Sequence, residues 1–197
     1  MVPRSQHAAV AGRPCARRLF LCVAIVVMIG AAGSAADEPL LTVTVSGGVY
    51  RVVATFSVPQ TPDTAIGVLT DFERIPEYVP DMKASTVVER TDTDTVVEQE
   101  AVATFMMFSR RIHLVLHVSE AAGRITFRDE CGKSFAVYEG SWVVKPAANG
   151  STITYRLAAK PAFDVPGFVL KRLLKRDASD LIERIKVEIN SRANLRK

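Results

Sequence analysis

The sequence has few of the residues that build metal centres and disulfide scaffolds. It contains three cysteines and three histidines among 197 residues. Cys15 and Cys22 fall in an apparent export signal, which leaves Cys131 alone, and one cysteine cannot form an internal disulfide. Cys131 is then either a reactive thiol or a spare, buried one. His113 and His117 share the solvent face of a predicted strand about 13 Å apart, too far for one metal ion. We therefore predict no metal site.

Short catalytic motifs are also lacking. There is no Gly-rich phosphate loop, no His-Glu zinc motif, no Gly-x-Ser-x-Gly elbow and no cysteine pair. Glu98 and Glu100 share one strand face and form a candidate acid/base pair, but the alternation of the strand predicts that both face solvent. Residues 128–130 are predicted to form an exposed strand end. We therefore predict no catalytic residue and no cofactor.

The first 36 residues are typical of a secretory signal peptide. They contain four arginines and no acidic residue, an apolar run over residues 19–29, and small residues at 34–36. The run is shorter than the roughly 20 residues of a membrane span, although its extension through Ala32 leaves an uncleaved anchor as an alternative. Residues 17–21 resemble a twin-arginine signal, but Ala16 and Cys22 depart from that pattern, so we expect the general secretory route.

This division predicts a signal peptide over residues 1–36 and one domain over residues 37–197 that is periplasmic or secreted. The chain has 25 basic and 21 acidic residues. Removal of the four arginines leaves 21 of each sign, so the mature domain is formally neutral. Its charge gives no reason to expect nucleic-acid binding.

Residues 164 to about 190 predict one long amphipathic helix. Its apolar positions recur at steps of three and four residues: Leu170, Leu174, Ala178, Leu181, Ile182, Ile185 and Ile189. Asp164 and Pro166 mark its start. Basic residues crowd its first turns at Lys171, Arg172, Lys175 and Arg176. Cations are unfavourable there, which suggests either an anionic partner or a solvated face partly balanced by Asp180.

Nearly everything upstream of this helix is predicted to be strand. Residues 40–58 alternate as a strand with a turn or bulge at 46–48, and two short helices follow over 61–70 and 71–79. Six further strands are predicted over residues 84–90, 95–105, 109–119, 124–130, 135–146 and 152–160. We therefore expect an α+β fold. In it, a curved antiparallel sheet of about seven strands wraps around the long C-terminal helix, with two short helices after the first strand.

Three segments carry a resemblance to a known superfamily. They are Val68–Pro80 between the short helices and the next strand, Phe135–Trp142 with its aromatic-x-x-x-x-Gly-x-Trp pattern, and Pro161–Pro166 before the last helix. They resemble the START-like helix-grip (SRPBCC) superfamily, which includes START lipid-transfer domains, coenzyme Q-binding proteins and polyketide cyclase/dehydrase-like proteins. The resemblance covers about residues 40–192. It is more specific for fold than for function.

The resemblance implies a mostly apolar cavity between the sheet and the last helix, suited to a lipid, an isoprenoid quinone or a polycyclic compound. The candidate lining residues are Leu114, Leu116, Phe127, Phe135, Tyr138, Trp142, Tyr155, Leu170 and Leu174. The aromatic residues among them either contact a ligand or fill the core. Phe135 and Trp142 cannot face the same side of a regular strand, so we expect a bulge at Gly140.

Three functions remain open. The first is a monomeric binding protein for a hydrophobic small molecule. The second is an aromatase/cyclase- or dehydratase-type enzyme, which requires polar groups such as Tyr155, Arg156 or Glu139 inside the cavity. The third is an interaction domain whose cavity is filled by its own side chains. The apolar tip Phe105-Met106-Met107-Phe108 either touches a membrane surface during exchange or packs on the core.

Overall fold

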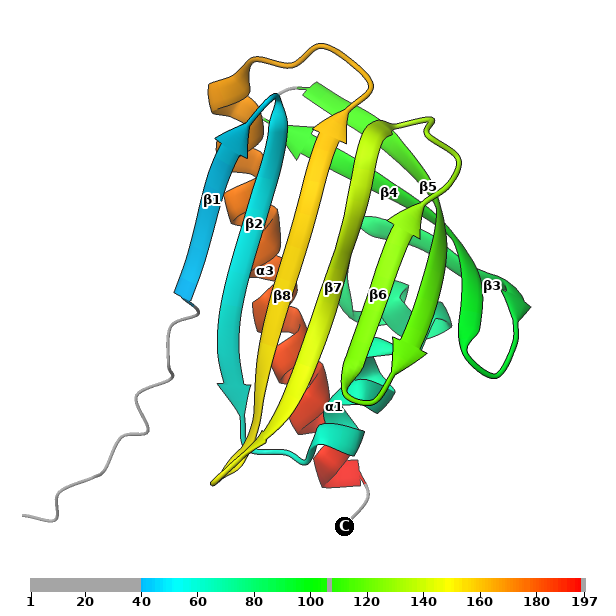
Figure 1. Ribbon diagram of the computed structural model, residues 1–197, viewed down its shortest axis with the longest axis vertical. Helices are drawn as coiled ribbons and strands as arrows, with labels where there is room; N and C mark the ends of the chain where they lie inside the picture. Colours follow the sequence, from blue (N-terminus) through cyan, green and yellow to red (C-terminus); the bar gives the residue numbers. More distant parts are fainter. Residues whose placement is uncertain (1–39, 106–107, 196–197) are drawn as a thin grey trace, which may run out of the picture. The chain divides into compact units, whose positions relative to one another are not determined.

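The computed structural model describes residues 40–105 and 108–195. Twelve elements occur in these ranges: β1 Leu40–Ser46, β2 Val49–Val58, α1 Pro62–Leu69, η1 Phe72–Arg74, α2 Ile75–Tyr78, β3 Met82–Arg90, β4 Asp94–Phe105, β5 Phe108–Ala121, β6 Arg124–Asp129, β7 Phe135–Ala147, β8 Gly150–Pro161 and α3 Gly167–Leu195. The strands form one antiparallel sheet in the order β1-β2-β8-β7-β6-β5-β4-β3 (Figure 1). The predicted α+β helix-grip fold is confirmed.

The first predicted strand is a hairpin. Gly47 and Gly48 adopt φ angles of 58° and 75°, a left-handed conformation that glycine accepts without steric cost. The chain therefore reverses, and β1 pairs with β2 along its length. This turn gives the described part of the sheet eight strands, where the sequence predicted about seven.

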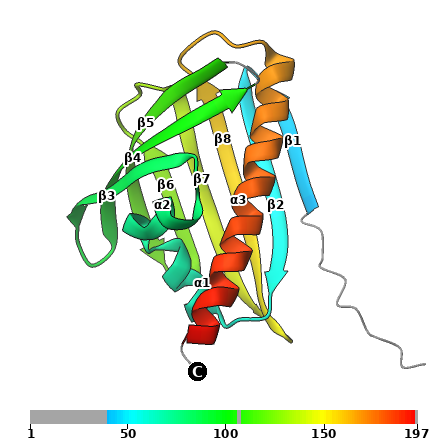
Figure 2. The same ribbon diagram turned by 180° about the vertical axis from the view of Figure 1, so that it is seen from behind.

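The two short helices lie between β2 and β3. Thr61 caps α1, because its hydroxyl accepts a hydrogen bond from the backbone N–H of Thr64 and Pro62 occupies the first turn. The second predicted helix is divided into η1 and α2. Both parts lie against β3, next to the lower half of α3 (Figure 2).

Helix α3 runs across the inner face of the sheet (Figure 2). Its predicted apolar stripe is confirmed, because Leu170, Ala178, Ile182, Ile185 and Ile189 are all buried. The helix begins at Gly167, and the carbonyl of Pro166 accepts the first backbone bonds. Asp164, which we predicted as the capping residue, lies three residues before the helix, so that prediction is wrong.

Alternation along the strands determines what faces α3. On β5, the predicted inward residues Ile112, Leu114, Leu116 and Val118 are buried, whereas His113 and His117 face outward as expected. On β7, the register shift lies between Phe135 and Val137 rather than at Gly140. The extra residue, Ala136, resolves the parity conflict, because it lets Phe135 share the inner face with Trp142.

Two of the predictions concern residues outside the described ranges. The predicted signal peptide over residues 1–36 lies there, and so do Met106 and Met107 at the centre of the apolar tip. Within residues 40–105 and 108–195, no helix has the length and apolar character needed to cross a membrane.

Candidate functional site

A cavity of about 130 Å³ lies between the sheet and α3. Its walls come from α1, η1 and α2, which we call the short-helix segment, from strands β3 to β8 and from the middle of α3. The lining residues are Leu69, Phe72, Ile75, Tyr78, Val79, Met82, Gln99, Leu116, Val118, Ile125, Phe127, Tyr138, Trp142, Tyr155, Leu181 and Ile185. Each of these six strands lines the cavity with inward-facing residues, so the apolar character of the cavity follows from the alternation along the strands.

The structure brings five of the nine candidate residues to this cavity. They are Leu116, Phe127, Tyr138, Trp142 and Tyr155. Phe135 does not line the cavity itself, but its ring packs against that of the lining residue Tyr138, with the ring centroids 4.9 Å apart. Leu114 and Leu170 are buried and Leu174 is partly buried, but none of these three lines the cavity. The middle of α3, where Leu181 and Ile185 lie, lines the cavity, and its first turns do not.

Sequence reasoning missed the wall formed by the short-helix segment. Leu69, Phe72 and Ile75 recur every three residues and, with Tyr78, line one side of the cavity. This spacing was a usable signal, because residues three apart share one face of a helical segment. We predicted two short helices over residues 61–70 and 71–79 and a family motif over residues 68–80, but we did not assign either to the cavity wall.

Stacked aromatic rings form the sheet side of the cavity. Trp142 and Tyr155, directly opposite each other on β7 and β8, stack with their ring centroids 4.2 Å apart and their planes inclined by 24°. Phe127 and Tyr138 lie 6.0 Å apart at a tilted angle. Such pairs contribute about 0.5–1.5 kcal/mol beyond their buried area, so the aromatic contacts stabilise this wall.

The polar groups of the cavity are neutral. Burial raises the pKa of Tyr78 and of Tyr138 to about 12 and the pKa of Tyr155 well above its usual value of 10. Gln99 donates a hydrogen bond to the hydroxyl of Ser85 at 3.1 Å. Among the described residues, the lining contains no carboxylate, histidine, lysine or arginine. The cavity is therefore apolar, with a few neutral hydrogen-bonding groups.

The polar residues that a cyclase would require do not converge. Tyr155 faces the cavity, but Arg156 and Glu139 lie on the opposite face of the sheet, in an open groove. Glu98 and Glu100 are exposed as predicted, and Glu98 lies 3.7 Å from Nε2 of His113. An acid/base pair is thus not assembled around the cavity by these residues.

Other predicted features acquire structural explanations. Arg128 and Glu130 are exposed at the end of β6, as predicted for residues 128–130. Asp129 between them is partly buried, and its carboxylate accepts hydrogen bonds from the backbone N–H groups of Val115, Cys131 and Gly132, which stabilises the β6–β7 loop. Cys131 is partly buried beside it, with Sγ 3.2 Å from Oδ1 of Asp129. On α3, Arg176 pairs with Asp177 at 2.8 Å, not with Asp180.

An ion-pair cluster fastens the short-helix segment to the end of α3. Nη1 of Arg192 lies 2.6 Å from the carboxylate of Asp71, and Nε lies 2.6 Å from that of Glu188. Arg74 pairs with Glu77 at 2.7 Å and lies 4.0 Å from Glu188. We call Asp71, Arg74, Glu188 and Arg192 the latch, because they hold one wall of the cavity against α3.

Solved structures with this architecture span lipid-transfer proteins and enzymes. A STAR-related lipid transfer protein from Xanthomonas axonopodis has a TM-score of 0.60 at 20% identity, over 78% of this chain and 99% of that chain. A START superfamily protein from Mycobacterium smegmatis has a TM-score of 0.63 at 17% identity, over 72% and 97%. A Streptomyces aromatase/cyclase has a TM-score of 0.64 at 13% identity, over 74% and 96%. At these identities the likeness shows the fold alone.

A comparison with curated proteins gave no match. The family described as polyketide cyclase/dehydrase and lipid transport matches residues 50–189. The match begins in β2 and ends in the last turns of α3, so it includes every element that lines the cavity. The chain therefore belongs to the polyketide cyclase/dehydrase and lipid transport family.

Proposed function

We propose that this protein binds a hydrophobic small molecule in the cavity between the sheet and α3, and that it acts as a carrier rather than as an enzyme. The observation that carries the proposal is the lining itself. It is built from aliphatic and aromatic side chains with neutral tyrosine hydroxyls and no ionised group among the described residues. Such a site favours an apolar body with one or two neutral polar points.

The size of the cavity sets a condition on this function. Sites for ligands of drug size measure roughly 300–1,000 Å³, whereas this cavity measures about 130 Å³. The sheet wall is fixed by its ladder bonds and aromatic stacking. The short-helix segment is joined to α3 mainly by side-chain contacts and the latch. We therefore propose that this segment moves outward when a lipid, an isoprenoid quinone or a polycyclic compound enters.

We further propose that the mature domain acts outside the cytoplasm and exchanges its ligand at a membrane surface through the tip at residues 105–108. One hydrogen bond and one exposed side chain support this part. Nη2 of Arg176 donates to the carbonyl of Thr104 at 2.9 Å, so the base of the tip lies beside the basic first turns of α3. Phe168, in the same turns, is 78% exposed. Exposed aromatic and cationic groups together suit a bilayer surface.

The carrier proposal is tested by native mass spectrometry of the purified protein, followed by organic extraction and identification of any bound compound. We expect a hydrophobic molecule in near-stoichiometric amount, or its uptake from a total lipid extract. Leu181→Phe places a larger side chain in the cavity and should lower occupancy at least about tenfold, since about 1.4 kcal/mol of lost contact is sufficient.

Val187→Phe is the matched control, because Val187 lies on the same helix but is 66% exposed. It should leave occupancy unchanged. A protein that is empty and stays empty in lipid extract would contradict the proposal. So would equal loss of ligand in both variants, since that would place the bound molecule outside the cavity.

A further inference from the structure

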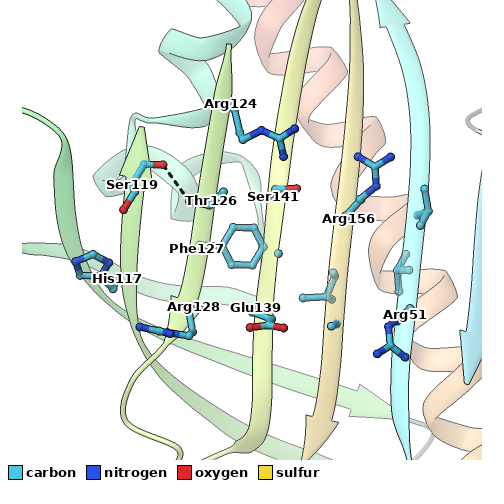
Figure 3. A pocket seen from close by; sticks show the side chains of 15 residues that line it. Arg51, His117, Ser119, Arg124, Thr126, Phe127, Arg128, Glu139, Ser141 and Arg156 are labelled. Carbon is cyan, nitrogen blue, oxygen red and sulfur yellow. Dashed lines mark hydrogen bonds between the residues drawn. The ribbon is translucent and has the colours of Figure 1, made fainter. Parts of the chain in front are cut away.

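A second hollow, larger than the helix-grip cavity, lies on the outer face of the sheet. It is an open groove of about 670 Å³ across β2, β8, β7, β6 and β5. Figure 3 shows four arginines around it: Arg51, Arg124, Arg128 and Arg156. The proposed carrier function does not use this groove.

The register of the sheet brings these arginines together from distant parts of the sequence. Ser141 of β7 pairs with Arg156 of β8 and with Thr126 of β6, so these three residues form one row across the groove. Arg124 and Arg128 flank Thr126 on β6, about 13 Å apart along the strand. Arg51 lies diagonally across from Arg156, at a spacing of about 7–8 Å.

The charge in the groove is unbalanced. The lining residues include four arginines and one carboxylate, that of Glu139. With histidine counted as neutral, their formal charge is +3. Arg128 lies 3.7 Å from Glu130. No acidic side chain in the described part of the chain forms an ion pair with Arg51, Arg124 or Arg156. Since the mature domain is formally neutral, this cluster is a local concentration of positive charge.

The floor of the groove offers hydroxyl groups. The side chain of Ser141 is buried at the centre, and none of the described residues occupies its hydroxyl with a hydrogen bond. Thr126 donates to the carbonyl of Ser119 at 3.4 Å, so its oxygen remains free to accept. Guanidinium groups at the rim and a hydroxyl donor on the floor suit phosphoryl oxygens, which arginine binds in bidentate geometry.

We propose that this groove binds a soluble compound that carries two or more phosphoryl groups. The four arginines surround a space about 13 Å across between backbone positions, wider than one phosphate but within reach of two or three linked ones, because the long arginine side chains extend towards its centre. The hydroxyl groups lie between the arginine side chains in a hollow, which favours a small soluble ligand over a bilayer, a surface that is flat on this scale. The charged rim excludes the apolar ligand proposed for the cavity.

The test is isothermal titration calorimetry of the mature protein with tripolyphosphate and with inorganic phosphate. We expect tripolyphosphate to bind and the single phosphate to bind at least about tenfold more weakly. The affinity should fall as salt is raised, because the groove is open to solvent. The double variant Arg124→Gln/Arg156→Gln should lose at least about tenfold in affinity.

Arg90→Gln/Arg184→Gln is the matched control, since both arginines are exposed and lie outside the groove. Equal effects of the two double variants would overturn the proposal, as would no binding of tripolyphosphate. Tighter binding of polyglutamate would overturn it in favour of an acidic protein partner. Binding confined to phosphatidylcholine vesicles that contain cardiolipin would overturn it in favour of a membrane. Thermal unfolding of each variant verifies that it is folded.

Discussion

Gly140 shows how one residue determines the shape of the cavity wall. A Cβ atom at this position would lie 2.5 Å from Cζ of Phe127 and would collide with the carbonyl oxygen of Arg156. The ring of Phe127 takes the space that a side chain on β7 would fill, and thereby reaches both the cavity and the floor of the outer groove. The glycine of the family motif is thus required by contact between strands.

We therefore expect Gly140→Ala to destabilise the protein by about 1–3 kcal/mol, the usual range for overpacking. Gly67→Ala is the matched control, because a Cβ there meets no atom within 4 Å. In helix α1 this change should be neutral or stabilise by about 0.5–1 kcal/mol. Urea unfolding monitored by Trp142 fluorescence measures both. Equal effects would show that Phe127 yields to the new methyl group.

At the scale of elements, the latch joins two segments that are 121 residues apart in the sequence. The side chain of Arg192 is 14% exposed and that of Glu188 is 16% exposed, so removal of one member leaves a poorly solvated charge. The short-helix segment has few other polar contacts with α3. The latch is therefore the contact that we expect to resist the proposed outward movement of the short-helix segment.

We expect Arg192→Gln to lower the free energy of unfolding by about 1–3 kcal/mol and to accelerate hydrogen exchange of the amides in residues 69–79. Arg184→Gln is the control, because Arg184 is exposed and makes one long bond of 3.4 Å to the carbonyl of Tyr78. It should change stability by no more than about 0.5 kcal/mol. If the two variants exchange at the same rate, the latch does not hold the wall.

Element order could be predicted from sequence because each local signal agreed with the fold. Alternating strands, the glycines at 47–48 and the long apolar stripe of α3 all specify structure within a few residues. The candidate site was only partly predictable. Tyr155 and Arg156 are adjacent on β8 and therefore face opposite sides of the sheet, and the burial of Ile153, Tyr155 and Leu157 assigns Tyr155 to the cavity face. The latch and the arginine groove depend on contacts between distant segments, for which local patterns carry no signal.

For the whole molecule, the cavity tyrosines predict a loss of stability in alkali. Burial raises the pKa of Tyr78 and of Tyr138 to about 12, and that of Tyr155 well above 10. A raised pKa in the folded state means that folding favours the neutral phenol. The corresponding stability is fully present below about pH 10, the pKa in the unfolded chain, and is lost as the pH rises towards 12.

We therefore expect the free energy of unfolding to fall by a few kcal/mol between about pH 10 and pH 12, since each pKa unit corresponds to about 1.4 kcal/mol. Urea titrations at a series of pH values measure the fall, and near-ultraviolet absorbance reports phenolate formation. Tyr155→Phe removes one of these three buried phenols and should flatten the dependence. Ionisation of these tyrosines near pH 10 in the folded protein would mean that water solvates their hydroxyl groups, and the apolar lining on which the carrier proposal rests would be wrong.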